Sequence, residues 1–291
     1  MSALSEWREQ VSACRKARER DDGAMWQRLA GWYDTWVQNN DYVDLVLSRL
    51  PVPLGRDTRI LEIGPGSGGL TLPMAATGVE VVGVEPSPAM REALAQNLAA
   101  ANLENVRVIP ERVEDGLTDV RGTFDLALAS HSLYNVVPID AVLRRLVRLA
   151  RHTLVLMGVG DQPSWYRALH RDFRGVKRVP SPHLAHFYPA LLEMGLLADV
   201  EIVWASANYV YESEEDLVEW WAFHLRVNGD HRGALRHRLL ELAERRGSRI
   251  GIYGRRRMAL LTMEGGRAVL WPPLTPALSP QGRGSLGKRT S

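Results

Sequence analysis

A glycine-rich segment, residues 60–70, holds the residues with the clearest chemical meaning. It reads Ile-Leu-Glu-Ile-Gly-Pro-Gly-Ser-Gly-Gly-Leu, and Gly64, Gly66 and Gly69 fit the spacing G-x-G-x-x-G. Glycines at this spacing let a strand turn sharply into a helix and let the backbone approach a ligand closely. The spacing by itself would also fit a tight turn that binds no ligand. The segment follows an apolar run and precedes a helical pattern, and this placement favours a nucleotide-like ligand.

Two glutamates near this turn narrow the chemistry of the ligand. Glu62 stands two residues before Gly64, at the expected mouth of the site, where a carboxylate would repel a pyrophosphate but suit a cationic ligand. Glu85 ends the next apolar run, where a carboxylate can accept hydrogen bonds from both ribose hydroxyls. S-adenosylmethionine fits both residues, because it carries an ammonium, a sulfonium and an adenosine but no phosphate. Glu85 alone does not separate this cofactor from NAD.

The segment 62–68, Glu-x-Gly-x-Gly-x-Gly, resembles motif I of the class I S-adenosylmethionine-dependent methyltransferases, and the resemblance extends over roughly residues 32–263. It implies a Rossmann-like seven-stranded α/β sheet with helices on both faces, and S-adenosyl-L-methionine as cofactor. In that family the counterpart of Glu62 helps to hold the methionine amino group. The implied cofactor contacts are Tyr33, Glu62, Gly64, Pro65, Gly66, Ser67, Gly68, Glu85, Pro86, Arg112, Val113, Ser130 and His131.

The stretch after the third apolar run departs from the family pattern. Family members often place an acidic residue there against the adenine amino group, whereas Arg112 holds the matching position in this chain. Glu111 or Glu114 can substitute for that acid, or the backbone of Val113 can suffice. This difference from the family pattern affects which residue is expected to contact the adenine, and it affects the predicted cofactor less.

Polar side chains follow the fourth apolar run, in Ala-Ser-His-Ser-Leu-Tyr-Asn at 129–135. Open α/β sheets bind ligands beyond the carboxyl ends of their strands, so Ser130, His131 and Tyr134 should line the pocket. His131 is the candidate general base, because its reference pKa of about 6.5 suits proton transfer near neutral pH. Tyr134 is the second candidate catalytic residue. The alternatives are that His131 packs against the cofactor and that positioning alone drives the transfer from an activated sulfonium.

Other motifs bear on substrate class and on metals. The chain lacks the Asp/Asn-Pro-Pro-aromatic motif of exocyclic base methylases, and its single cysteine, Cys14, lies outside the predicted core. The pair His183-x-x-His186 has no flanking acid to complete a metal site, so we expect loop histidines and no metal. The segment Gly-Arg-Arg-Arg at 254–257 is either an anion contact or a solvated turn.

Alternating strand and helix patterns predict the elements that must position these residues. Strands are expected at 59–63, 80–84, 106–109, 124–129, 153–157, 200–205 and 258–263, and helices near 70–77, 88–101, 139–150, 165–173, 184–194, 213–227 and 233–246. Ser87 and Pro88 suit the N-cap and first position of one helix. We expect five parallel strands plus a reversed final hairpin.

Composition shifts divide the chain into three predicted parts. Residues 1–55 should form N-terminal helices that cap the site, and Tyr33 lies there in a Tyr-Asp segment that many small-molecule methyltransferases fold over the cofactor. Residues 56–264 should form the methyltransferase domain, with an insertion after the fifth strand at about 161–198. Residues 265–291 lack periodicity and contain several prolines, so we expect a disordered tail.

Composition and charge exclude several classes of protein. The 291 residues are 45% hydrophobic and 24% charged, with a formal net charge of +2, which is far from the charge of a dedicated nucleic-acid binder. One cysteine excludes an internal disulfide framework, and no apolar run reaches the roughly 18 residues of a membrane span. We expect a cytoplasmic monomer or homodimer with a small-molecule substrate and neither nucleic acid nor membrane as partner.

These features together predict an S-adenosylmethionine-dependent methyltransferase that acts on a small molecule by in-line displacement. The alternatives are an NAD(P)-dependent oxidoreductase, a methyltransferase acting on protein or nucleic acid, and a non-catalytic S-adenosylmethionine-binding protein. The sequence leaves open the acceptor, whether O, N, C or S is methylated, the use of a general base, the oligomeric state and the role of the tail.

Overall fold

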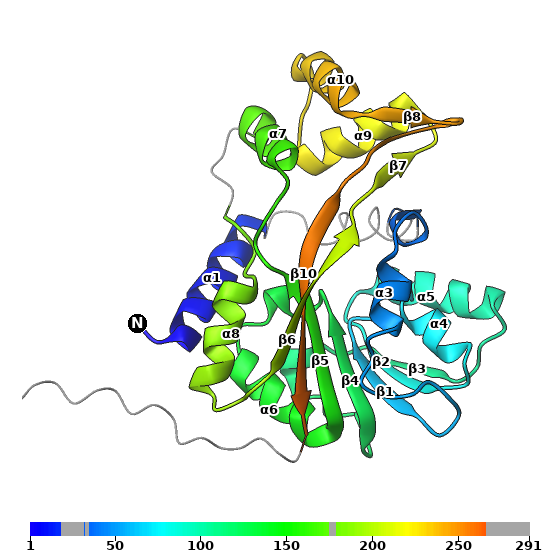
Figure 1. Ribbon diagram of the computed structural model, residues 1–291, viewed down its shortest axis with the longest axis vertical. Coiled ribbons are helices and arrows are strands. Elements are labelled where there is room, and N and C mark those ends of the chain that lie inside the picture. Colours follow the sequence, from blue (N-terminus) through cyan, green and yellow to red (C-terminus); the bar gives the residue numbers. More distant parts are fainter. Residues whose placement is uncertain (19–31, 33–34, 175–178, 266–291) are drawn as a thin grey trace, which may run out of the picture.

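The computed structural model describes residues 1–18, 32, 35–174 and 179–265 (Figure 1). A seven-stranded sheet organises this part of the chain, in the order β3-β2-β1-β4-β5-β10-β6. Strands β1 to β5 are parallel, and β10 runs antiparallel to its neighbours β5 and β6. The bounds are β1 Arg59–Ile63, β2 Glu80–Val84, β3 Val106–Ile109, β4 Phe124–Ser130, β5 Ala150–Gly158, β6 Asp199–Ser206 and β10 Arg255–Glu264.

The strand order reverses between β1 and β4, and this reversal positions the site. The chain runs outward from β1 to β3 and then returns to place β4 beside β1. Ligands of open α/β sheets bind in the crevice at such a reversal, beyond the carboxyl ends of the strands. β1 ends at Ile63, directly before Gly64, and β4 ends at Ser130, directly before His131. The fold therefore brings the glycine turn and the polar segment at 129–135 to neighbouring strand ends.

Helices cover both faces of the sheet, because alternate residues of each strand enter two different cores. On one face Leu61 and Ile63 share a core with α6 (Ile139–Leu149) and α8 (Leu184–Glu193). On the other face Ile60 shares a core with α3 (Tyr42–Leu47) and α4 (Thr71–Ala75). A further helix, α5 (Pro88–Ala100), joins β2 to β3. This arrangement confirms the predicted α/β sheet with helices on both faces.

The first helix, α1 (Ala3–Arg18), packs on α8 and on the short turn η2 (Leu133–Asn135) that follows β4. Trp7 is completely buried there, and its indole Nε1 donates a hydrogen bond to the carbonyl oxygen of Val136 at 2.8 Å. The ring of Trp7 also meets Phe187 of α8 edge-on, with the ring centroids 5.4 Å apart. These contacts attach α1 to the polar segment at the end of β4.

A smaller assembly, which we call the cap unit, stands beyond the carboxyl ends of the parallel strands (Figure 1). It combines α7 (Ser164–Arg174), which follows β5, with elements from the connection between β6 and β10. Leu169 of α7, Trp221 of α9 and Leu235 of α10 are fully buried in its own apolar core. The other elements are β7 Tyr209–Tyr211, α9 Glu214–Leu225, α10 His231–Leu242, β8 Glu244–Arg246 and β9 Arg249–Ile252, and the three strands pair in the order β7-β9-β8.

The structure corrects two details of the predicted fold. The last two strands of the main sheet do pair antiparallel, but they are not a hairpin, because residues 207–254 between them build most of the cap unit. The expected helix at 233–246 ends at Leu242, and residues 244–246 form β8 instead. These three residues are exposed and lack an alternating pattern, so their strand state depends on pairing with β9. No helix of the described residues could cross a membrane.

Candidate functional site

The glycine turn after β1 has a backbone that glycine adopts far more easily than other residues. Gly64, Gly66 and Gly68 have φ angles of +72°, +59° and +106°. A Cβ on Gly64 would lie 2.6 Å from the Cβ of Ser132, in the turn after β4. A Cβ on Gly66 would meet nothing closer than Met90 Sδ at 4.0 Å. Gly64 is therefore packed closely against the turn after β4, whereas a side chain at Gly66 would point into open space.

The rest of the turn serves packing. A Cβ on Gly68 would lie 2.1 Å from Leu72 Cδ1 and 2.7 Å from Leu94 Cδ1, so this glycine lets α4 and α5 approach the turn. Pro65 and Ser67 are buried beside it. The predicted cofactor contacts of these three residues stay predictions, and their burial shows that they also hold the shape of the turn.

Glu62 is not at the mouth of the site, as the sequence suggested, but is only 3% exposed. One carboxylate oxygen accepts a hydrogen bond from the Thr71 hydroxyl at 2.7 Å. Burial raises the pKa of Glu62 to about 7, against the effect of the Thr71 hydrogen bond, and the neighbouring Glu85 raises it further. Glu62 therefore does not act as a permanent surface charge that repels anionic ligands. A cationic group beside Glu62 would instead favour its ionised form.

Glu85, at the end of β2, ties the glycine turn to the start of α5. One of its oxygens accepts the Gly66 N–H at 3.1 Å, and the other accepts the Ser87 N–H at 2.9 Å. Burial raises the pKa of Glu85, although these two hydrogen bonds oppose the shift. A carboxylate has about four acceptor sites, so both oxygens can still accept a hydroxyl. Pro86 follows on the surface. Glu85 therefore lies directly beside the open space at Gly66, and its contact with a ribose stays a prediction.

Arg112, aligned with the family's adenine-binding acid, is engaged in an ion pair. Its guanidinium lies 2.8 Å from Glu114 Oε1, and the same oxygen lies 2.7 Å from the guanidinium of Arg15 on α1. Although burial acts in the opposite sense, these arginine hydrogen bonds lower the pKa of Glu114. Glu111 accepts hydrogen bonds from the loop that follows it. Both candidate substitutes are thus occupied, while Val113 is buried between them.

A hydrogen-bonded network connects the ends of β4 and β5. His131 has a φ of +53°, and its Nδ1 lies 2.7 Å from the Tyr134 hydroxyl oxygen. The Gly158 N–H, at the end of β5, donates to the same oxygen at 2.8 Å. On the preceding residue, the Ser130 hydroxyl is hydrogen-bonded to the hydroxyl of Tyr42, a buried residue of α3. The predicted residues Ser130, His131 and Tyr134 thus lie together.

This network holds the His131 ring in place. The Tyr134 oxygen accepts from Gly158 and is hydrogen-bonded to His131 Nδ1, and either of these two atoms can be the donor, depending on the imidazole tautomer. Burial lowers the pKa of His131 to about 3, and the charge of Arg256 adds to the effect. The Nε2 atom is buried and has no hydrogen-bond partner in the described part of the chain. Burial and the charge of Arg256 thus favour a neutral imidazole, and the general-base role of His131 stays a prediction.

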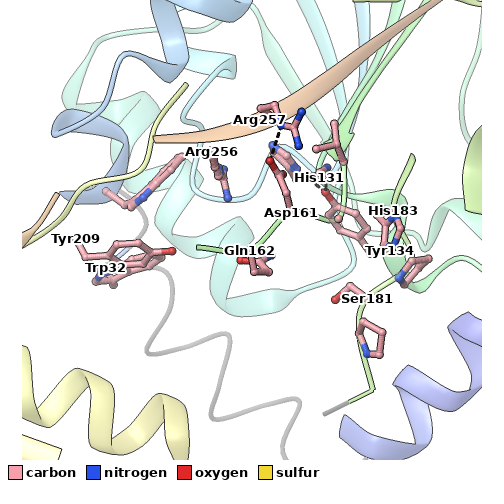
Figure 2. Close-up of a pocket in the computed structure, with 16 residues that line it drawn as sticks. Trp32, His131, Tyr134, Asp161, Gln162, Ser181, His183, Tyr209, Arg256 and Arg257 are labelled. Carbon is pink, nitrogen blue, oxygen red and sulfur yellow. Dashed lines mark hydrogen bonds and ion pairs between the residues drawn. The ribbon is translucent and has the colours of Figure 1, made fainter. Parts of the chain in front are cut away.

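A cavity of about 290 Å³ opens beside this network (Figure 2). The ends of β4 and β5, the start of β10, the segment before α8 and aromatic side chains from 32, 36 and 209 enclose it. Its lining residues are Trp32, Trp36, His131, Tyr134, Gly158, Val159, Gly160, Asp161, Gln162, Pro180, Ser181, Pro182, His183, Tyr209, Arg256 and Arg257.

The arginines of β10 line this cavity and are not only a solvated turn. Arg257 Nε lies 2.6 Å from a carboxylate oxygen of Asp161, and Arg256 lies with its guanidinium 4.9 Å from the centre of the Trp36 ring. The Gly-Arg-Arg-Arg run was the sequence signal for Arg256. No local signal marked Tyr42, Trp32 or Tyr209 as site residues, because the tertiary fold brings them there.

The histidine pair at 183 and 186 begins α8. The Ala185 N–H donates to His183 Nδ1 at 3.4 Å, and the His183 N–H donates to His186 Nδ1 at 3.3 Å. These reciprocal bonds form a capping box, which satisfies backbone donors that a helix start leaves unpaired. Tyr33, the remaining predicted cofactor contact, lies outside the described residues.

The strand order and the glycine turn after β1 define a Rossmann-like α/β protein. Residues 61–153 match the family model described as a methyltransferase domain. A putative methyltransferase from Bacillus halodurans has a similar fold, with a TM-score of 0.52, 10% sequence identity and coverage of 77% of this chain and 98% of that chain. Residues 61–153 are thus similar to a methyltransferase domain, and the fold is similar to that of a putative methyltransferase.

Curated relatives match over short segments. The ribosomal RNA small subunit methyltransferase A of Cutibacterium acnes is 37% identical over 93 residues, which are 30% of this chain and 30% of that protein. The ubiquinone biosynthesis O-methyltransferase of Rhodopseudomonas palustris is 30% identical over 111 residues, which are 37% of this chain and 41% of that protein. The chain thus spans less than half the length of these relatives, and their names include both RNA and small-molecule pathways.

Proposed function

We propose that the protein transfers the methyl group of S-adenosylmethionine to a small molecule bound in the 290 Å³ cavity. The observation that carries this proposal is the position of the cavity. It lies at the ends of β4 and β5, directly beside the strand reversal where Gly66 and Glu85 would hold the adenosine of the cofactor. Its volume is at the lower end of the range for small-ligand pockets, which favours a small acceptor over a macromolecular one.

The residues at β1 and β2 fit the cofactor. Glu85 would accept hydrogen bonds from the ribose hydroxyls, the open backbone at Gly66 would allow close approach, and Glu62 would ionise opposite the ammonium group. When bound, S-adenosylmethionine supplies an activated methyl group. The protein then gains rate mainly by holding the acceptor atom in line with that group at attack distance.

The residues at β4 and β5 would position the acceptor. Tyr134 is hydrogen-bonded to Nδ1 of His131, and both residues line the cavity. We propose both as acceptor-positioning residues. An acceptor that is nucleophilic at the working pH fits this arrangement, since it needs no proton acceptor of high pKa in the site.

Calorimetric titration tests the cofactor. The wild-type chain should bind S-adenosylmethionine and S-adenosylhomocysteine but not NADH, and Glu85→Ala should weaken that binding by about tenfold or more, because charge-assisted hydrogen bonds to hydroxyls are lost. Glu80→Ala is the matched control on the same strand, since Glu80 lies on the surface and pairs with Arg59. Binding of NADH in place of S-adenosylhomocysteine would overturn the proposal.

Incubation with S-adenosylmethionine and a small-metabolite extract tests the transfer. Mass spectrometry should find an extract compound whose mass rises by that of one CH₂ group, only when enzyme and cofactor are both present. Methylation confined to the RNA or protein fraction would contradict the small-molecule acceptor. Cofactor binding without any methylated product would favour a binding protein without catalysis.

A further inference from the structure

The charges around the cavity do not balance. Of its two arginines, Arg257 is neutralised by Asp161 at 2.6 Å. Arg256 has a buried Nε without a hydrogen-bond partner, and no carboxylate of the described residues forms an ion pair with it. Figure 2 shows Arg256 and the Arg257–Asp161 pair side by side at the cavity. The positive charge of Arg256 is therefore available to interact with a ligand.

A second polar atom of the same cavity lining has no partner. His131 Nε2 is buried and unbonded in the described part of the chain, while Nδ1 of the same ring is hydrogen-bonded to Tyr134. The guanidinium of Arg256 is close enough to His131 to act on its ionisation. In the tautomer that carries its proton on Nε2, His131 and Arg256 would be two neighbouring donors for an oxyanion.

Aromatic rings continue the wall beside these donors. The guanidinium of Arg256 lies 4.9 Å from the centre of the Trp36 ring. Trp32 and Tyr209 stack with their ring centroids 5.9 Å apart, and Figure 2 shows them together at one end of the cavity. Such rings suit the flat apolar body of a ligand better than a strongly hydrated one.

We propose that the methyl acceptor is a small monocarboxylate with a planar apolar body, whose carboxylate is held by Arg256 and by His131 in the tautomer that carries its proton on Nε2. This inference rests on the proposed function, because it assumes that the ligand of the cavity is the methyl acceptor. A monoanion is favoured over a dianionic phosphate ester, because a single cation is unpaired while Asp161 keeps Arg257 neutralised. The planar body would lie against Trp36 and the ring pair of Trp32 and Tyr209.

Binding of benzoate, benzamide and phenyl phosphate, measured by calorimetry with and without S-adenosylhomocysteine, tests this inference. Benzoate should bind at least about tenfold more tightly than its neutral isostere benzamide, because the charge-assisted hydrogen bonds need the carboxylate. Arg256→Gln should remove that preference and leave the affinity for S-adenosylhomocysteine unchanged. Arg255→Gln is the matched control, since Arg255 is the exposed neighbour on β10 and lies over Trp204 outside the cavity lining.

Each contrary result has a distinct meaning. Equal binding of benzoate and benzamide, or no binding of either, overturns the inference, as does tighter binding of phenyl phosphate. If Arg256→Gln weakens S-adenosylhomocysteine instead, Arg256 serves the cofactor carboxylate and the inference is again overturned. If the wild type binds no S-adenosylhomocysteine, the proposed function fails, while the benzoate preference measured alone still reports on the anion site. Thermal unfolding of both variants verifies that they are folded.

Discussion

At the scale of single residues, the site holds its buried ionisable groups near or in their neutral forms. Burial raises the pKa of Glu62 to about 7 and lowers that of His131 to about 3. Both shifts have the same physical cause, since a charge loses hydration when it leaves water. The charge state of the site therefore responds to a ligand, because a cation near Glu62 or an anion near Arg256 changes the cost of ionisation.

The raised pKa of Glu62 makes stability depend on pH. Between the reference value of 4.5 and about 7 the folded chain binds more protons at Glu62 than the unfolded chain does, so stability falls as pH rises through this window. The full loss above pH 7 is about 3 kcal/mol. Urea unfolding from pH 5 to 8 should show this decline relative to Glu62→Gln, which cannot ionise. Parallel stability curves for the two proteins would contradict the buried, proton-binding carboxyl.

Tyr134 should affect transfer more than cofactor binding. Tyr134→Phe leaves His131 Nδ1 and the Gly158 N–H without their partner, which should cost about 1–3 kcal/mol of stability. The freed imidazole can then change tautomer, so kcat should fall by about tenfold while the dissociation constant of S-adenosylhomocysteine stays the same. Tyr188→Phe, on α8 outside the cavity lining, is the control. An unchanged kcat in Tyr134→Phe would exclude the positioning role.

At the scale of elements, helix starts are specified by local hydrogen bonds. Ser87 caps α5 by accepting the Met90 N–H at 3.4 Å, as its sequence context predicts. Ser213 caps α9 by accepting the Asp216 N–H at 3.1 Å. The histidine capping box of α8 does the same with imidazole nitrogens, and a sequence pattern that resembles a metal pair thus has a structural role in this chain.

Removing a cap should destabilise one helix and leave the site intact. His186→Ala and Ser213→Ala each remove one acceptor of a helix-start N–H, and each should lower the free energy of unfolding by about 1 kcal/mol. Neither residue lines the cavity, so S-adenosylhomocysteine affinity should not change. Urea unfolding and calorimetry measure the two effects. A loss of cofactor affinity in His186→Ala, matched by stabilisation of the wild type by zinc, would instead support a metal role.

At the scale of the whole molecule, the proposed cofactor and acceptor sites depend on different parts of the chain. The glycine turn and Glu85 belong to β1 and β2, inside the parallel sheet. The cavity proposed for the acceptor is completed by Tyr209 of the cap unit and by the start of β10. The long connection between β6 and β10 thus contributes a wall of the cavity, and variation of this unit can change the acceptor without changing the cofactor.

A core substitution in the cap unit should separate the two sites. Trp221 is fully buried and its ring centroid lies 5.5 Å from that of Tyr209, so Trp221→Ala should cost about 3–5 kcal/mol within that core and displace Tyr209. Benzoate binding should be lost while S-adenosylhomocysteine binding persists. Trp204→Ala, on the exposed face of β6, is the control. Loss of both ligands together, in a protein that remains folded, would show that the sites are not separable.

Much of the fold could be predicted because its signals are local. Parallel strands buried on both faces, such as β1 and β2, appear as short apolar runs, and both have the predicted bounds. The edge strand β3 also has the predicted bounds, although only Ile109 of it is buried. The exposed strand β8 and the short β7 have no such signal, because pairing partners distant in sequence stabilise them. Among the site residues, those directly after β1, β2 and β4 could be predicted from their place at strand ends. Tyr42 and Tyr209 could not.

The sequence by itself determined the glycine turn, the order of the parallel strands and of the helices between them, and the acid after β2, since each depends on residue types at short spacing. Only the tertiary structure decided that Glu62 is buried, that His131 is buried beside Tyr134, that Arg257 is paired and that Arg256 forms no ion pair with the described residues. The reason is physical: hydration, pKa and hydrogen-bond partners are set by atoms that the fold brings together from distant segments.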